Sequence, residues 1–487
     1  MTEPSPPSPR SRLTDPFREG TRLDPRLVGL WVLINAIVLV NALRHAPAIN
    51  YDGSAHINYL VTLGQQGRLP TPWDTTEFFS PPLPYVVPAL AIRVGAEIAT
   101  ALKLAQLFQW LLSMVLTHGV LRLCGRVSSQ PVVKLGALGL IALCPVYYKS
   151  FAFIRGEPYA ACFVVLFLDS TLALLLAERV RLARVATLAA LGGAVLLSRQ
   201  WGAAALGAAA CLIGVRSVQR PRRAREWLVA GLLALTLAAQ LGGWFYVFLH
   251  LRFGSALAFN RGHARELSIA NQPASFYGDL ALATVFRDPI RPGFPNRLWP
   301  LLYTEVWGDY WGYWIVWGRD VAEQRWVSGP ELEARTVVPP VPAVLETNRF
   351  RVGRYLGRVN AISLAPTVLA LVALGAAFAR ALRFAVARAS ERTGDDEAAR
   401  FTLTATIGGT LVGYAWFLLM YPNPDKGDTI KATYLLQIFP LWAVLGGDWL
   451  ARLHARAPRA ARWIAVLLAA VFLHNLPALV TRYAGAG

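Results

Sequence analysis

The feature that most constrains this chain is a series of apolar runs, each of roughly the length that crosses a lipid bilayer as a helix. About 30 Å of hydrocarbon requires roughly 20 apolar residues in helical conformation. With 55% hydrophobic and only 16% charged residues, the chain holds more apolar surface than a soluble core of its size would bury. We therefore predict an all-α, multi-pass membrane protein with about 11 transmembrane helices. The predicted spans are residues 27–43, 104–121, 135–148, 158–177, 185–198, 201–215, 227–249, 361–379, 401–420, 434–450 and 463–480.

The positive charge of the chain indicates how it is oriented. The net charge is +19, from 48 basic and 29 acidic side chains, and most of the excess lies in short loops between predicted spans. Because basic loops favour the cytoplasmic side, we interpret the charge as a topology signal and expect no nucleic-acid partner. The clusters assigned to the cytoplasmic side are Arg10 to Arg26, Arg122 to Lys134, Arg179 to Arg184, residues 216–225, Arg380 to Arg400 and Arg452 to Arg462.

The composition also divides the chain into regions. Residues 1–26 are rich in Pro and Ser and predict a disordered cytoplasmic tail. The first apolar run lacks a small-residue cleavage site, so we expect a retained span. The rest divides into a transmembrane module with functional outer loops at 27–249, an extracytoplasmic loop region at 250–360, and C-terminal transmembrane helices at 361–487. The four cysteines show no metal-ligand spacing.

Counting spans between the basic clusters assigns a side to every loop. If the N-terminal tail and residues 122–134 are both cytoplasmic, only two membrane crossings can lie between them, namely the predicted spans 27–43 and 104–121. The proline-rich segment 81–98 therefore should not cross, and we expect a helix that lies at the outer interface. The long segment 250–360 is rich in Trp and should fold over the membrane surface. The segments assigned to the outside are 44–103, 149–157, 199–200, 250–360, 421–433 and the C-terminus.

Acidic and basic residues from six stretches within these outer segments converge on one face. Ionisable groups beside a bilayer are costly unless they are paired or hydrated, so this convergence predicts a functional site. Taken singly, a basic residue at a span end can simply anchor in the headgroups. In "YDGSAH" Asp52 lies four residues before His56, which places both on one face if a short helix begins with Asp52 as its N-cap. A plain helix cap is the alternative explanation for Asp52.

The first outer loop resembles that of a known enzyme class. The run "YDGSAHINYLVTLGQQGRLP" followed by "EFFSPPLPYVV" is similar to the first extracytoplasmic loop of GT-C integral membrane glycosyltransferases, which include protein O-mannosyltransferases and aminoarabinose transferases. In that class the loop opens with an acid, and Asp52 occupies the corresponding position in this sequence. Gly53 occupies a position where a second acid is common, and Ser80 replaces the usual His before Pro81 and Pro82.

The resemblance continues in four later segments. "FIRGEPY" places Arg155 and Glu157 at functional positions of the family's second loop, and "GGAVLLSRQW" places Arg199 where a lysine is common. "GGWFYVFLHLRFGSAL" resembles the stretch that leads into the long loop, and "DTIKATYLLQIFP" resembles a late segment with a basic residue and a Tyr. The order of these motifs carries the resemblance. It implies a membrane glycosyltransferase of the bacterial cell envelope that uses a polyprenyl-phosphate sugar, in the inner (plasma) membrane with its site facing the periplasm or exterior.

Physical chemistry assigns roles within that resemblance. An inverting sugar transfer needs a base for the acceptor hydroxyl and cations for the departing phosphate. We expect Asp52 as the base, with His56 and Glu157 as further catalytic residues; an ion pair with Arg155 is the alternative for Glu157. We expect no cofactor and no metal, because guanidinium groups can neutralise a phosphate. The predicted phosphate ligands are Arg155, Arg199, Arg252 and Lys431. The predicted acceptor or sugar ligands are Glu77, Tyr85, Asp309 and Tyr434.

Expected partners are a polyprenyl-phosphate-linked sugar, an acceptor glycan, lipid or protein, and membrane lipids. Two other functions stay open on the residues alone. A multi-pass transporter would carry ionisable groups near the middle of its spans and internal repeat symmetry. An envelope glycan polymerase or ligase would need the same acids and arginines at the outer face.

Overall fold

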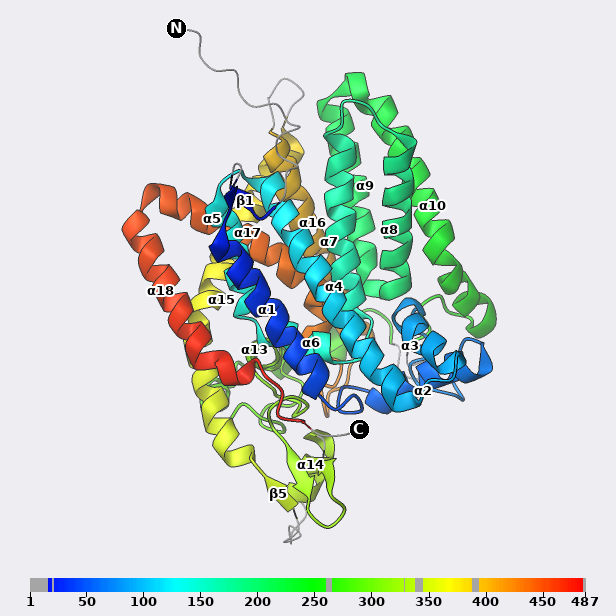
Figure 1. The fold of residues 1–487 in the computed structure, drawn as a ribbon, viewed down its shortest axis with the longest axis vertical. Coiled ribbons are helices and arrows are strands. Elements are labelled where there is room, and N and C mark those ends of the chain that lie inside the picture. The colour runs from blue at the N-terminus through cyan, green and yellow to red at the C-terminus, as the bar shows by residue number, and fades with distance from the viewer. Residues whose placement is uncertain are drawn as a thin grey trace.

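The chain folds into a bundle of long, tilted helices that run between two polar ends (Figure 1). The computed structural model describes residues 16–19, 22–259, 265–327, 329–337, 345–387 and 394–484; the predicted tail therefore lies largely outside the described residues. Nine helices within these ranges are long and apolar enough to cross a membrane, which confirms an all-α multi-pass protein. They are α1 (Pro25–Arg44), α4 (Ile98–Val127), α7 (Glu157–Leu175), η3 with α9 (Gln200–Gln219), α10 (Pro221–Phe253), α15 (Arg349–Val386), α16 (Asp395–Met420), η5 with α17 (Ala432–Arg456) and α18 with η6 (Pro458–Ala478).

The two remaining predicted spans take other forms. The run at 135–148 is not one straight helix, because α5 (Pro131–Ala142) and α6 (Pro145–Ala152) meet at an angle of 66°. Pro145 has no N–H to continue the α5 ladder, and its ring disfavours helical geometry at Cys144, so the chain turns there. The run at 185–198 becomes α8 (Leu182–Ser198), a shorter apolar helix. If the bent pair is one span, the count is ten.

One end of the bundle, which we call the Asp52 end, carries the elements that follow α1 and α10. The segment between α1 and α4 forms α2 (Gly53–Val61), the π-helical turn η2 (Thr62–Gln66) and α3 (Leu83–Arg93). Helix α3 is the segment expected to lie at the interface. Residues 269–347 add short helices and a small sheet that the sequence did not predict. These are η4 (Ile269–Asn271), α11 (Ala274–Gly278), α12 (Leu282–Val285), α13 (Leu298–Trp307), α14 (Gly329–Val337), β3 (Gly318–Asp320), β4 (Arg325–Val327) and β5 (Leu345–Thr347).

The small sheet is antiparallel in the order β4-β3-β5, with Gly318 opposite both Val327 and Thr347. Figure 1 shows α14 and β5 at the same end of the bundle as α2 and α3. The segments 44–103 and 250–360, which charge counting assigned to one side, therefore do share an end.

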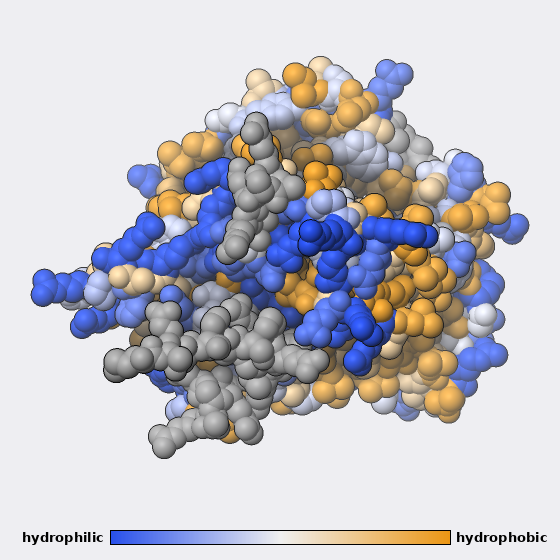
Figure 2. Space-filling view, turned by 90° about the horizontal axis from the view of Figure 1, so that it is seen from above, coloured by the Kyte–Doolittle hydropathy of each residue, from blue (hydrophilic) through white to orange (hydrophobic). Residues whose placement is uncertain are grey.

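The described residues of the predicted basic clusters lie at the opposite end (Figure 1). Near it, β1 (Arg18–Glu19) and β2 (Arg22–Leu23) form a short antiparallel pair ahead of α1. Figure 2 looks onto this end and shows hydrophilic side chains over much of its centre and hydrophobic ones along part of the rim. Buried ion pairs hold these helix ends together: Arg400 binds Asp448, and Arg126 binds Asp169.

The last described residues close the Asp52 end. Thr481 donates its N–H to Asn41 Oδ1 of α1 at 2.9 Å. The Tyr483 hydroxyl donates to Gly312 O at 2.7 Å, and the Arg482 N–H donates to Trp314 O at 2.9 Å. The C-terminal segment thus ties the first helix to the Trp-rich loop.

Candidate functional site

Asp52 lies immediately before α2 in a conformation that is unusual for its residue type. Its φ is 55° and its ψ 30°, in the left-handed region, and its side chain makes no capping hydrogen bond. Asp52 therefore occupies the N-cap position of the predicted helix, but its side chain does not cap the helix. Its carboxylate instead accepts a bond of 2.8 Å from Lys431 Nζ. Non-glycine residues in this region are held there against a free-energy cost by their surroundings.

The residue after Asp52 lies directly against the backbone of the preceding loop. A Cβ on Gly53 would lie 2.4 Å from the carbonyl oxygen of Ala48. No side chain fits there without moving the backbone, so a second acid at this position is sterically excluded in this chain. The close approach also fixes the direction in which Asp52 leaves the backbone.

A continuous chain of charged contacts runs from the second loop to the first. Arg155 Nε donates to Glu157 Oε2 at 3.1 Å, and Arg199 Nε donates to Glu157 Oε1 at 3.0 Å. Arg199 Nη1 then reaches Glu77 Oε2 at 3.3 Å. Ser80, which stands where the family has a His, bonds to both Glu77 and Arg199. All these side chains are buried, so each charge depends on its partner.

Tyr51 joins this chain to a second ion pair that the sequence analysis did not identify. Lys149 Nζ lies 2.8 Å from Glu305 Oε2, with both side chains fully buried. The Tyr51 hydroxyl donates to the same Glu305 oxygen, and the Tyr51 carbonyl accepts from Arg155 Nη1 at 3.1 Å. The only local signal for Tyr51 was its position next to Asp52.

Three cations surround the ring of Tyr51. Lys431 Nζ lies 5.3 Å from the ring centroid, Arg155 Cζ 5.5 Å and Lys149 Nζ 5.7 Å. These distances are within the range of cation–π attraction. We call the following residues, together with Tyr51, the charged cluster: Asp52, Glu77, Lys149, Arg155, Glu157, Arg199, Glu305 and Lys431.

Tyr434, which the sequence analysis offers as an acceptor or sugar ligand, borders the charged cluster. Its ring centroid lies 5.5 Å from Arg155 Cζ and 5.7 Å from Lys431 Nζ. On its other side Tyr434 belongs to an aromatic group from three elements, η3, α16 and η5. The contacts of Tyr434 in this group are with Trp201 at 5.7 Å, Phe417 at 6.0 Å and Tyr414 at 6.4 Å between ring centroids.

His56 makes its hydrogen bond with Tyr85. Its Nδ1 lies 2.6 Å from the hydroxyl of Tyr85, and both side chains are fully buried. Burial, more than any charge nearby, lowers the pKa of His56 to about 4, so the ring is neutral at pH 7. Its Nε2 is buried and has no hydrogen-bond partner among the described residues. His56 and Tyr85 are therefore a neutral pair beside the charged cluster.

Four carboxylates and four cations of the charged cluster balance one another. Asp52 differs from the rest because 42% of its side chain is exposed, whereas the side chain of Lys431 is only 9% exposed. The Lys431 ammonium, and to a lesser degree Arg155, holds the pKa of Asp52 well below its usual range. Asp52 is thus an ionised acid that solvent can reach.

Two charged candidates from the sequence, Arg252 and Asp309, lie outside the charged cluster. Arg252, in the last turn of α10, is exposed and makes no hydrogen bond or ion pair with the cluster within the described residues. Asp309 is buried, and its carboxylate accepts the backbone N–H groups of four residues: Tyr313, Trp314, Ile315 and Val316. Asp309 therefore shapes the Trp-rich loop, because its acceptor sites are already occupied. A metal site was not expected, and no group of three or more His, Cys, Asp or Glu that could hold a metal occurs in the part of the chain that is described.

No protein-family model and no curated protein sequence matches this chain. Among solved structures, the chain is similar to two crystal structures of ArnT from Cupriavidus metallidurans, one bound to undecaprenyl phosphate and one in the apo state. Each shares 15% sequence identity over 88% of this chain and 79% of that chain, with a TM-score of 0.36.

Proposed function

We propose that this protein is a membrane glycosyltransferase that moves a sugar from a polyprenyl-phosphate donor to an acceptor hydroxyl, with inversion, at the extracytoplasmic surface of the membrane. The observation that carries the proposal is the pairing of Asp52 with Lys431 within the charged cluster. One exposed carboxylate beside buried cations supplies both a base and a phosphate site, which are the two groups that such a transfer requires.

Lys431 is the cation best placed to meet the donor phosphate. Its Nζ contacts the exposed carboxylate, whereas the guanidinium groups of Arg155 and Arg199 are occupied by Glu157 and Glu77. The two arginines add positive charge near Lys431 and hold together the loops that carry Glu157 and Glu77. In this mechanism Lys431 binds the phosphate directly, and Arg155 strengthens the field around it.

Donor binding and base activation are coupled in this mechanism. A carboxylate whose pKa is far below its usual range is a weak base. When the donor phosphate takes Lys431 Nζ, Asp52 loses the contact that lowers its pKa most, and its basicity rises. Asp52 becomes an effective base only after the donor has bound, which limits proton abstraction in the empty enzyme.

The bond changes follow from these positions. Asp52 accepts the proton of the acceptor hydroxyl while that oxygen forms a bond to the anomeric carbon of the sugar. The bond between this carbon and the phosphate oxygen breaks, and the polyprenyl phosphate leaves with the electron pair, stabilised by Lys431. Tyr434 and Trp201, packed at 5.7 Å, offer apolar ring surface beside Lys431 for the sugar or the first isoprene units.

The test is sugar transfer by membranes that contain the full chain. Radiolabelled polyprenyl-phosphate sugars are supplied to the wild type, to Asp52→Asn and to Asp428→Asn. Asp428 is an exposed acid three positions before Lys431 and serves as the matched control. We expect Asp52→Asn to lose about 10²–10⁴-fold in rate at normal expression, and Asp428→Asn to transfer normally. Unchanged transfer by Asp52→Asn would remove Asp52 as the base, and a wild type inactive with every donor would overturn the enzyme assignment.

A further inference from the structure

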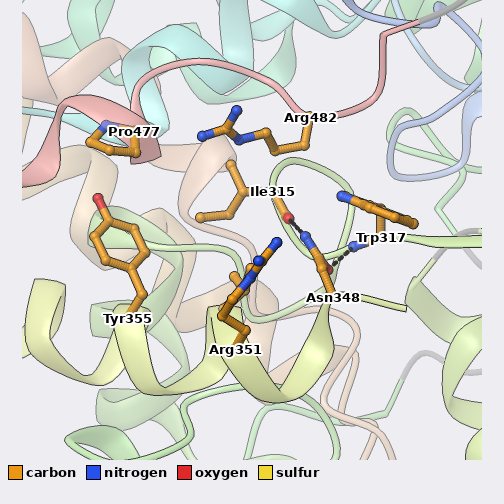
Figure 3. A pocket seen from close by; sticks show the side chains of 8 residues that line it. Ile315, Trp317, Asn348, Arg351, Tyr355, Pro477 and Arg482 are labelled. Carbon is orange, nitrogen blue, oxygen red and sulfur yellow. Dashed lines mark hydrogen bonds between the residues drawn. The ribbon is translucent and has the colours of Figure 1, made fainter. Parts of the chain in front are cut away.

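A cavity of about 480 Å³ opens at the Asp52 end, between the start of α15 and the end of α18. Figure 3 shows its walls, which come from three segments: the loop before β3, the first turns of α15 and the C-terminal segment. The residues that line it are Ile315, Trp317, Asn348, Arg351, Val352, Tyr355, Pro477 and Arg482. None of them belongs to the charged cluster.

Two guanidinium groups extend toward this cavity from opposite walls, those of Arg351 and Arg482 (Figure 3). Neither side chain makes an ion pair or a hydrogen bond with any residue that the structure describes. Residues 348–360 of α15 and its N-cap contain no acid, and Asp288, which packs against Gly353 of this helix, makes no ion pair with either arginine within the described residues. Paired guanidinium groups next to apolar walls bind the oxygens of a phosphate with two hydrogen bonds each.

The walls that carry these arginines are rigid. Asn348 donates to Ile315 O at 2.8 Å and accepts from the Trp317 N–H at 2.9 Å. Arg482 is fixed through its own N–H to Trp314 O, at 2.9 Å. Tyr355 donates its hydroxyl to His474 O at 3.1 Å, which joins α15 to α18. A rigid pocket binds its ligand with little loss of conformational entropy.

The position of the cavity along α15 corresponds to the level of lipid headgroups. The predicted apolar span of α15 begins at residue 361, and at 1.5 Å per residue Tyr355 lies about 9 Å beyond it. Trp317 and Tyr355 are of the residue types that collect at this depth. Below the cavity, α15 and α18 are the helices with much of their apolar surface uncovered, as at Val368, Leu473 and Leu476.

We propose that this cavity binds the phosphate headgroup of an anionic membrane lipid, with Arg351 and Arg482 holding the phosphate and the acyl chains lying along α15 and α18. The unpaired positive charge selects an anion, and the uncovered apolar helices continuing from the cavity select one that carries hydrocarbon chains. The assignment is independent of the glycosyltransferase proposal, because the site shares no residue with the charged cluster.

The test measures thermal unfolding of the purified full chain in detergent, with three additives: phosphatidylglycerol, phosphatidylcholine and glycerol phosphate. A ligand that binds the folded state raises Tm in proportion to its occupancy. We expect phosphatidylglycerol to raise the Tm of the wild type, with little effect from the other two. The double variant Arg351→Gln/Arg482→Gln should lose this rise, and Arg354→Gln, an exposed arginine on the same helix outside the cavity, should keep it.

Native mass spectrometry of the same proteins gives a second readout, since lipid retained by the wild type and Arg354→Gln should be absent from the double variant. If the double variant fails to fold, each single variant is tested in the same way. An equal rise with phosphatidylcholine would overturn the preference for an anionic headgroup, and an equal rise with glycerol phosphate would overturn the lipid assignment. Lipid retention by the folded variants would overturn the site.

Discussion

Lys431 Nζ lies 2.8 Å from Asp52 Oδ2, although 379 positions of the chain separate the two residues. The contact joins the segment after α1 to the segment before α17, and the helices between them pack around it. Because Lys431 is nearly buried, losing Asp52 would leave its charge without its carboxylate partner. The pairing is therefore both a structural contact and the centre of the proposed chemistry.

The pairing makes a prediction about pH. Asp52 must be ionised to act as a base, so the rate falls as the pH drops through its pKa. Lys431 lowers that pKa, and Lys431→Gln should therefore shift the acid limb of the pH–rate profile upward, toward the ordinary aspartate value of about 4. The measurement is the midpoint of that limb, which a uniform loss of rate would not move. Lys426→Gln, an exposed lysine in the same loop, should leave the midpoint unchanged. A shift downward, or none, would contradict the role given to Lys431.

Gly53 should tolerate no added methyl group. Its Cβ would meet the Ala48 carbonyl at 2.4 Å, so Gly53→Ala must displace the start of α2 and with it Asp52. We expect a loss of about 1–3 kcal/mol in stability and a fall in transfer. Gly29→Ala is the matched control, since no atom lies within 4 Å of its Cβ position. Thermal unfolding and transfer assays check both variants, and a Gly53→Ala protein as stable and active as the wild type would refute the close approach.

The buried pair of Lys149 and Glu305 should show strong coupling. Lys149→Met alone leaves the Glu305 carboxylate buried without its cation, which costs about 3–5 kcal/mol. Changing Glu305→Gln in the same protein removes the unpaired charge and keeps one acceptor oxygen, for either the Tyr51 hydroxyl or the Trp311 N–H, which bond to different Glu305 oxygens. The double variant should therefore melt at a higher temperature than Lys149→Met. A double variant whose loss equals the sum of the single losses would show that the two charges do not interact.

Arg199 and Arg252 were predicted alike as phosphate ligands, and the structure separates them. The planar fork of Arg199 bonds to Glu157, Glu77 and Ser80 together, and a lysine ammonium cannot reproduce that geometry. Arg199→Lys should cost about 1.5–3 kcal/mol of stability per lost charged bond and lower the transfer rate, because the loops that Arg199 joins carry the charged cluster. Arg252→Lys should have little effect, because Arg252 is exposed and lies outside the charged cluster. Equal losses in the two variants would contradict this separation.

The helical architecture and the grouping of the outer loops follow from the sequence. An apolar run of the right length must satisfy its backbone within itself in a bilayer, so hydropathy alone locates the helices. The break before Pro145 departs from the predicted span because a short-range steric effect overrides the apolar pattern. The sheet of β3, β4 and β5 was missed because three-residue strands leave almost no periodic pattern.

The candidate site, like the fold, could be predicted from the sequence only in part. Asp52, Arg155, Glu157, Arg199, Glu77 and Lys431 were selected from the chain because polar residues at span ends stand out against an apolar background, and they do lie in one cluster. Tyr51 and Glu305 could not be given their roles, since a Tyr or Glu in an aromatic loop has many possible partners.

The sequence by itself determined the features that depend on neighbouring residues. These are which stretches are helical and apolar, and which loops share an end of the bundle. Only the tertiary structure decided which acidic and basic side chains form ion pairs with each other. In the folded chain Lys431 pairs with Asp52 and Lys149 pairs with Glu305. Asp309 accepts hydrogen bonds from backbone N–H groups, and Arg252 is exposed. The physical reason is that a buried charge is stable only beside a specific partner, and that partner is brought within 3 Å by the packing of helices hundreds of residues apart.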